Sequence, residues 1–260
     1  QDVEFDHTGK NLVVQSPVEK DARYVLTVRY IGTPKPTAAP TTRSDFSTSG
    51  WHITSEGRTW TMQEPYGAYT WYPVNDQPSD KALYDFTITV PSPRVGIANG
   101  EMTSQSEADG LTTTTWHTSE PMSSYLVTVA TGEYTMTTNT TEGSGFEISY
   151  WIPTDEDPVV TRRLHTAARA LDWLEALLGP YPFDSLGFLL VENRSGMETQ
   201  TMVTLGLTEY TTSTPVLLHE MVHHWYGDEV SPDDWRDMWM NEGMTMYLQG
   251  LWTAEEEGIP

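Results

Sequence analysis

The chain has 260 residues, of which 14 are Lys or Arg and 37 are Asp or Glu, so its formal net charge is −23. Such an acidic surface repels phosphates, which argues against nucleic acids and anionic membranes as partners. The chain has no cysteine, which excludes disulfides and thiol chemistry, and no apolar run approaches the length of about 18 residues that a membrane-spanning helix requires.

The first part of the chain is predicted to be rich in β-strands. Residues 24–30 and 86–90 alternate apolar and polar side chains, which predicts strands with one buried face, and residues 125–130 predict another strand. Residues 137–145 are rich in Thr, Asn and Gly, which predicts a loop near a domain boundary. The many threonines and the lack of a long helical period favour an antiparallel β saddle or sandwich, which we assign to residues 1–146.

The character of the sequence changes after residue 146. Apolar residues at helical spacing predict a helix over residues 159–178, which Gly179 and Pro180 end. A buried strand is predicted at residues 188–191, and two more helical patterns follow it. Residues 147–260 are therefore predicted to form an α/β domain, and the whole chain to be an α+β protein of two domains.

The first of these two helical patterns contains His219, Glu220 and His223, which spell HExxH. Histidines four residues apart lie on one face of a helix, so both imidazoles can reach one small cation. Most other positions of the pattern are apolar, and buried histidines and glutamates need partners. His224 lies about 100° further around the helix, so we do not expect it to be a ligand.

Glu242 completes the pattern, because it lies in the second helical pattern with eighteen residues between it and His223. Two neutral nitrogens and one carboxylate are a ligand set of catalytic zinc, whose fourth position is left for water. We therefore predict that His219, His223 and Glu242 hold one Zn²⁺ ion and that Glu220 is the general base for the metal-bound water. Asp228 is interpreted either as a carboxylate that orients a ligand histidine or as an ordinary residue at a helix end.

Two further segments belong with this motif. Residues 195–199 match the pattern G-x-M-E-N at its methionine and glutamate, whereas serine and threonine replace its glycine and asparagine. Residues 64–82 match E-P-x-x-A-R-x-x-F-P-x-x-D-x-P-x-x-K-A without a gap, with tyrosine in place of the arginine. Together with HExxH and the distant glutamate, these segments make the chain resemble the M1 metallopeptidases, which are zinc aminopeptidases of the gluzincin group.

The resemblance implies a fold, an activity and a set of substrate contacts. Residues 147–260 would be the first part of a thermolysin-like catalytic domain, and the activity would be zinc-dependent removal of N-terminal residues. In the family, the glutamate of G-x-M-E-N grips the substrate N-terminus, which assigns this role to Glu198, and the position of Glu64 also contacts the amine. The backbone around Gly196 and Met197 would pair with an extended peptide as an added strand. The expected partners are therefore peptides with a free N-terminus.

Two alternatives remain open: another gluzincin hydrolase, which cuts internal peptide bonds or a non-peptide substrate, and a module that binds metal or peptide without turnover. The family places a tyrosine that supports the oxyanion some tens of residues after the last ligand, and the chain ends before that position. We therefore expect a fragment of a longer enzyme that has little activity alone. The composition resembles exported bacterial relatives, which favours a secreted or cell-envelope location over a cytoplasmic one. The sequence does not indicate the oligomeric state.

Overall fold

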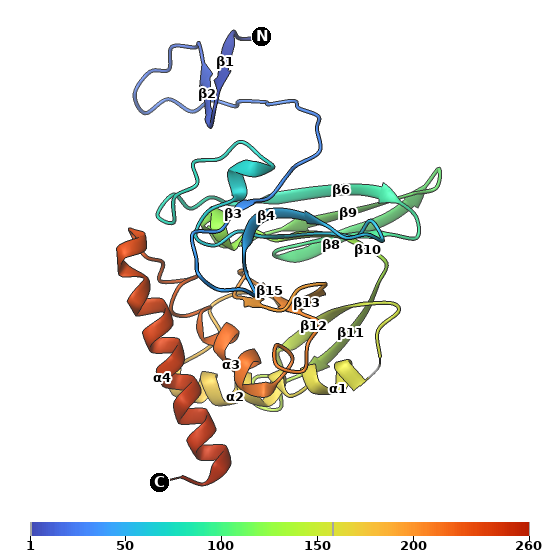
Figure 1. Ribbon diagram of the computed structural model, residues 1–260, viewed down its shortest axis with the longest axis vertical. Helices are drawn as coiled ribbons and strands as arrows, with labels where there is room; N and C mark the ends of the chain where they lie inside the picture. The colour runs from blue at the N-terminus through green and yellow to red at the C-terminus, as the bar shows by residue number, and fades with distance from the viewer. Residues whose placement is uncertain (1, 158, 260) are drawn as a thin grey trace.

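The computed structural model describes residues 2–157 and 159–259, which form three layers (Figure 1). Antiparallel sheets from the N-terminal part lie on one face of a central mixed sheet. Helices α1 (Val159–Leu164), α2 (Ala167–Leu178) and α3 (Thr214–Val222) lie on the opposite face, and the long helix α4 (Met238–Glu257) runs along one side (Figure 1). A β-rich part followed by a partial helical domain confirms the predicted fold class. No helix among the described residues combines the length and the apolarity that crossing a bilayer requires.

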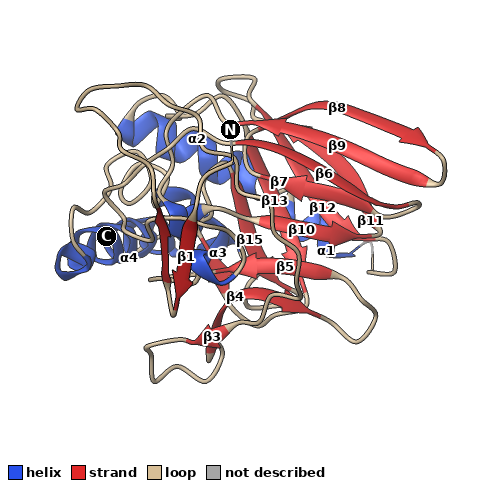
Figure 2. Ribbon diagram, turned by 90° about the horizontal axis from the view of Figure 1, so that it is seen from above, coloured by secondary structure: helices blue, strands red, loops and turns tan. Residues whose placement is uncertain are grey.

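Three antiparallel sheets make up the N-terminal part. In the view from above, strand β1 (Phe5–Thr8) overlaps the helices, and most other strands lie to their right (Figure 2). Strands β1 and β2 (Asn11–Val14) form a hairpin that stands apart from the other layers in Figure 1. The five-stranded sheet has the order β3–β4–β5–β10–β7, with strands Thr37–Ala38, Thr48–Ile53, Thr59–Met62, Val129–Gly132 and Val95–Ala98. The three-stranded sheet has the order β6–β9–β8, with strands Asp85–Pro91, Leu111–His117 and Glu101–Ala108. Two 3-10 helices, η1 (Ala68–Thr70) and η2 (Ser124–Leu126), lie between these strands.

The central sheet has the order β11–β12–β13–β15–β14, with strands Tyr134–Thr140, Glu147–Pro153, Leu186–Val191, Met202–Gly206 and Gly196–Met197. Its three inner strands are parallel, and the two edge strands are antiparallel to their neighbours. Strand β13 is apolar along its whole length because both of its faces are covered. Phe188 and Leu190 pack into the core beneath the helices, whereas Leu189 and Val191 pack into the core shared with the N-terminal sheets. The predicted domain boundary between residues 146 and 147 falls in the turn between β11 and β12, and it stays a prediction.

Two of the three strands predicted in the N-terminal part are corrected by the structure. Residues 86–90 lie in β6, as predicted. Residues 24–30 form no strand, and Val25 is 94% exposed, because no described strand lies beside this segment to pair with its backbone. Residues 125–130 form a strand only at their end, since the 3-10 helix η2 takes up their beginning.

Two predictions in the second part also need correction. The helix predicted over residues 159–178 is interrupted between α1 and α2, where the Thr166 hydroxyl donates to the Arg163 carbonyl and competes with the helical ladder. The loop predicted at residues 137–145 begins only at Thr141, because the threonine-rich strand β11 pairs with β12 as far as Thr140.

Candidate active site

Helix α3 carries the two histidines of the HExxH motif and holds them against the central sheet. Pro215 lies in its first turn, and its regular part ends at Val222, so His223 is the C-terminal cap residue. Leu217, Leu218, Met221 and Val222 are fully buried in the core beneath the helices. This burial fixes the rotation of the helix, and with it the direction in which His219 and His223 point.

Helix α4 brings Glu242 to the two histidines from a second direction. Its residues Leu248 and Trp252 pack into the same core as α3, which holds the two helices together. The Nε2 atoms of His219 and His223 each lie 3.6 Å from a different carboxylate oxygen of Glu242. The structure thus brings together the three side chains that the sequence assigned to a metal ion.

The spacing of these three groups fits a small divalent cation. Zinc in a tetrahedral site lies about 2.0–2.2 Å from its nitrogen and oxygen ligands, which places the ligand atoms about 3.3–3.6 Å apart. The surroundings also favour positive charge. Burial alone would lower the pKa of His219, but the carboxylates of Glu242 and Glu220 outweigh it and raise this pKa to about 9.

Outer hydrogen bonds orient both imidazoles. The Nδ1 atom of His219 lies 2.9 Å from Oε1 of Gln249, which is an acceptor. The Nδ1 atom of His223 lies 3.2 Å from the Thr245 hydroxyl and 3.3 Å from the Tyr226 carbonyl. Since Thr245 gives its own proton to the Asn241 carbonyl, it too acts as an acceptor here. In their neutral form both rings therefore carry the hydrogen on Nδ1, which leaves the Nε2 lone pairs free to bind a metal.

Glu220 lies beside the metal ligands without joining them. It is only 6% exposed, and its carboxylate lies so close to Gly196 that a methyl group at that position would collide with it. Burial raises the pKa of Glu220 to about 8, and the carboxylates of Glu198 and Glu242 add to this rise, although His219 opposes it. A buried carboxyl with a pKa near neutrality can both take up and release a proton at physiological pH.

Two more glutamates converge on the same place from different parts of the chain. Glu198 follows β14, is 3% exposed, and has a carboxylate oxygen within 4.8 Å of Glu220 and His223. Glu64 follows β5, and burial, followed by the charge of Glu198, raises its pKa well above the ordinary value. The Oε1 atoms of both residues are buried and have no hydrogen-bond partner among the described residues. Two unpaired carboxylate oxygens in a shielded position suit an ammonium group.

Strand β14 offers a free edge beside these glutamates. Gly196 and Met197 pair with Leu205 and Thr204 of β15, and β14 is the last strand of the central sheet in the described part of the chain. The outer edge of β14 can therefore accept an extended peptide as an added strand.

His224 and Asp228 lie outside the group of proposed metal ligands. The Nδ1 atom of His224 lies 2.7 Å from the Tyr181 hydroxyl, and its Nε2 atom lies 3.5 Å from Asp228. Burial lowers the pKa of His224 to about 3, so the ring is neutral. Asp228 therefore faces His224 rather than a ligand histidine, and Gln249 and Thr245 occupy the orienting positions. Thr245 lies three residues and Gln249 seven residues after Glu242, on the same helix face, and this spacing could have identified them from the sequence.

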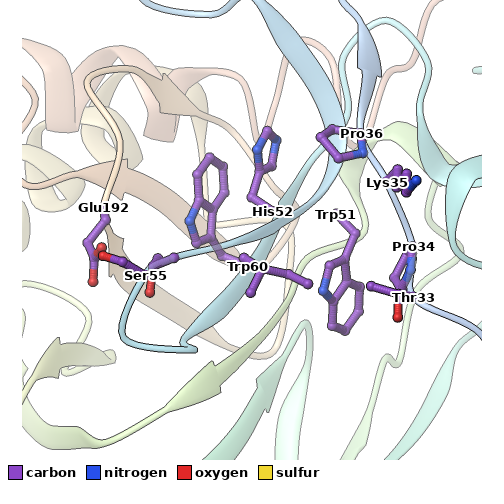
Figure 3. Close-up of a pocket in the computed structure, with 11 residues that line it drawn as sticks. Thr33, Pro34, Lys35, Pro36, Trp51, His52, Ser55, Trp60 and Glu192 are labelled. Carbon is purple, nitrogen blue, oxygen red and sulfur yellow. The ribbon is translucent and has the colours of Figure 1, made fainter.

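A separate hollow of about 470 Å³ opens elsewhere on the molecule (Figure 3). His52 stacks on Trp60 at 4.0 Å between ring centres, and Trp51 and Glu192 also line the hollow. None of the candidate metal or amine-binding residues is among the described residues of its lining. The chemistry assembled on α3, α4 and β14 is therefore not located in this hollow.

Comparison with known proteins gives consistent matches along the chain. Residues 1–126 match the model of the peptidase M1 N-terminal domain, and residues 162–258 match the model of the peptidase family M1 domain. Human glutamyl aminopeptidase is 25% identical over 252 residues, which cover 91% of this chain and 26% of the relative. A puromycin-sensitive aminopeptidase of Caenorhabditis elegans is 27% identical over 210 residues, which cover 74% of this chain and 22% of the relative. The chain thus spans about a quarter of the length of these curated relatives.

Solved structures with the same fold include bacterial enzymes. The M1 zinc metallopeptidase from Deinococcus radiodurans superimposes with a TM-score of 0.82 at 29% identity, over 100% of this chain and 59% of that chain. A mutant of that metallopeptidase bound to a Tyr-Ser-Ala substrate has a TM-score of 0.84 at 28% identity, over 99% of this chain and 59% of that chain.

Proposed function

Because this chain belongs to the M1 peptidase family, we propose that it carries the zinc site and the amine-binding site of an aminopeptidase. The supporting observation is the meeting of two groups of side chains in one place. His219, His223 and Glu242 offer three ligand atoms to one divalent ion. Glu198 and Glu64 offer unpaired carboxylate oxygens beside them. The first group suits hydrolysis, and the second suits recognition of a free N-terminus.

In this proposal, His219, His223 and Glu242 hold one zinc ion. When bound, zinc supplies Lewis acidity, which lowers the pKa of a water molecule toward about 7 and polarises a carbonyl group. Glu220 accepts a proton from the water that attacks the peptide carbonyl and delivers it to the departing amine. Its buried carboxylate lies beside Gly196, where the peptide bond would pass, so it is placed to take up and release a proton in each cycle.

Recognition of the substrate N-terminus makes the proposed enzyme an exopeptidase. An α-ammonium group has three N–H donors, and Glu198 and Glu64 can accept from them with charge-assisted hydrogen bonds. The peptide then extends along the free edge of β14, past Met197 and Gly196. Its first peptide bond passes Gly196, where the carboxylate of Glu220 lies.

A comparison of blocked and free peptides tests the proposal. The zinc-loaded protein is expected to hydrolyse a peptide with a free N-terminus at a low but measurable rate and to refuse its N-acetylated form. Glu198→Gln is expected to lower kcat/KM for the free peptide about 100-fold, because charge-assisted hydrogen bonds to the ammonium group are lost. Glu220→Gln is expected to reduce turnover by about 10²–10⁴-fold while zinc content stays unchanged.

Other results would contradict the proposal. Equal hydrolysis of the acetylated peptide would indicate an endopeptidase rather than an aminopeptidase. Unchanged turnover in Glu220→Gln would remove Glu220 from the chemistry. A protein that binds zinc and peptides but hydrolyses neither form would be a binding module without turnover.

A further inference from the structure

One basic side chain reaches the candidate site from a distant part of the chain. Arg43 lies in the loop between β3 and β4, and its Nη2 atom donates to the hydroxyl of Ser195 at 2.9 Å, across 152 residues of sequence. Ser195 is the residue just before Gly196 of β14. The loop therefore places a positive charge at the start of the strand along which the proposed substrate extends.

The guanidinium of Arg43 is held in one orientation and keeps free donors. Its Nε and Nη2 atoms donate to the two carboxylate oxygens of Asp45 at 3.2 and 2.7 Å. Its Nη1 atom has no hydrogen-bond partner among the described residues, so two N–H groups remain available. The side chain is 60% exposed, so a ligand can approach it from solvent. A guanidinium fixed in this way loses little freedom when it binds a carboxylate.

Arg43 also counteracts the negative charge of the site. Hydrogen bonds with Asp45 raise the pKa of Arg43 above its ordinary value, and Glu64 and Glu220 add to the rise. Without this cation, a substrate that carries a carboxylate would meet mainly the repulsion of the clustered glutamates.

The order of residues along β14 determines which end of the substrate lies beside Arg43. In the proposed function the amine is held at Glu198 and the first peptide bond lies beside Gly196, and the carboxylate of Glu220 is found next to Gly196. Ser195 and Arg43 come next in the same direction, so they lie on the side of the departing peptide. Three residue steps of extended chain, from Glu198 to Ser195, correspond to about 10 Å, which is about the length of an extended tripeptide.

We propose that Arg43 forms a carboxylate-binding subsite for the departing part of the peptide substrate. Its ligand is either the C-terminal carboxylate of a short peptide or an acidic side chain just after the cleaved bond. The proposal rests on the function proposed above and adds to it a preference that neither the zinc site nor the amine-binding glutamates provide.

Three tripeptides with a free N-terminus test the subsite: Ala-Ala-Ala, its C-terminal amide, and the amide of Ala-Glu-Ala. We expect kcat/KM of the wild-type protein to be about two- to fivefold higher for the carboxylate-bearing peptides than for the neutral amide, as for one partly exposed charge pair. Arg43→Gln should bring the ratio close to one, because the guanidinium that binds the carboxylate is lost. Arg43→Lys should keep only part of the preference, because lysine retains the positive charge but lacks the planar guanidinium.

Arg169→Gln is the matched control, because Arg169 also pairs with a carboxylate and is 58% exposed, but it contacts Glu256 near the end of α4. Its ratio should equal that of the wild-type protein. Calorimetric binding of the same peptides to the zinc-loaded Glu220→Gln protein gives the same comparison without turnover.

The results separate the possible ligands and the possible failures. A preference for Ala-Ala-Ala alone identifies the terminal carboxylate as the ligand, and a preference for the glutamate peptide alone identifies an acidic side chain. Equal ratios in the wild-type protein and Arg43→Gln, with all three peptides hydrolysed, overturn the subsite and leave the aminopeptidase function intact. Failure to hydrolyse or bind any of the three peptides overturns the proposed function, and the subsite with it.

Discussion

The hydrogen bond between Gln249 and His219 gives a sharp test of the proposed metal site. Gln249 lies on α4, and its Oε1 atom is 2.9 Å from Nδ1 of His219, whose side chain is 18% exposed. Gln249→Leu keeps a similar volume but removes the acceptor, so the Nδ1–H group loses its partner in a shielded place. Loss of such an outer bond typically weakens metal binding about 10- to 100-fold, which corresponds to about 1.4–2.7 kcal/mol.

The dissociation constant for zinc can be measured by competition with a chromophoric chelator at fixed pH. We expect Gln249→Leu to bind zinc about 10- to 100-fold more weakly and Gln249→Glu to bind it at least as tightly as the wild-type protein, because a carboxylate is a stronger acceptor. Tyr247→Phe is the control, since Tyr247 lies on the same helix and is 60% exposed. Equal zinc affinity in Gln249→Leu and Tyr247→Phe would refute the idea that this hydrogen bond orients a ligand.

Three further predictions concern stability. Burial raises the folded-state pKa of Glu220 to about 8, so in metal-free protein the unfolded state loses this proton first and stability falls as the pH rises from about 4.5 to 8. Glu220→Gln should therefore raise the Tm of metal-stripped protein at pH 8 and change it little at pH 4.5. An equal shift of Tm at both pH values would disprove this. The side chain of Arg58 is 15% exposed and forms salt bridges with Asp155 and Glu192. Arg58→Met should therefore lower the free energy of unfolding in urea by about 1 kcal/mol, whereas Arg236→Met, at an exposed position, should not change it. Similar decreases in both variants would count against the role of these salt bridges. Tyr181→Phe removes a buried hydrogen bond of 2.7 Å and should cost about 1–3 kcal/mol, which unchanged denaturation would contradict.

The centre of the candidate site was predictable from sequence because its geometry is local. Two histidines one helical turn apart must share a face, whatever the rest of the fold does. Glu242 could be added because a ligand set of two nitrogens and one carboxylate restricts the choice of partners. The roles of His219, His223 and Glu242 as ligands stay predictions until metal binding is measured.

The parts of the fold that could not be predicted depend on contacts across the sequence. The alternation over residues 24–30 describes which side chains would share a face, but a strand also needs a neighbour to pair with. Arg43 carries no local pattern that connects it to Ser195, because their contact spans 152 residues and depends on the path of one loop. Gln249 was accessible in principle, since it lies on the same helix face as Glu242, but a glutamine has many other uses on a helix surface.

The proposed metal site draws its ligands from two helices, and this arrangement has a thermodynamic consequence. Any ion bound between α3 and α4 favours the docked arrangement of the two helices. Binding of the ion therefore stabilises the docking of α4 by the same free energy by which the docking of α4 strengthens binding of the ion. Trp252 lies three turns beyond Glu242 and contacts Trp173 of α2 with 5.3 Å between ring centres. Loosening that distant aromatic contact would therefore weaken ion affinity without changing a single ligand atom, and a tightly bound ion would protect the far end of α4 from fraying.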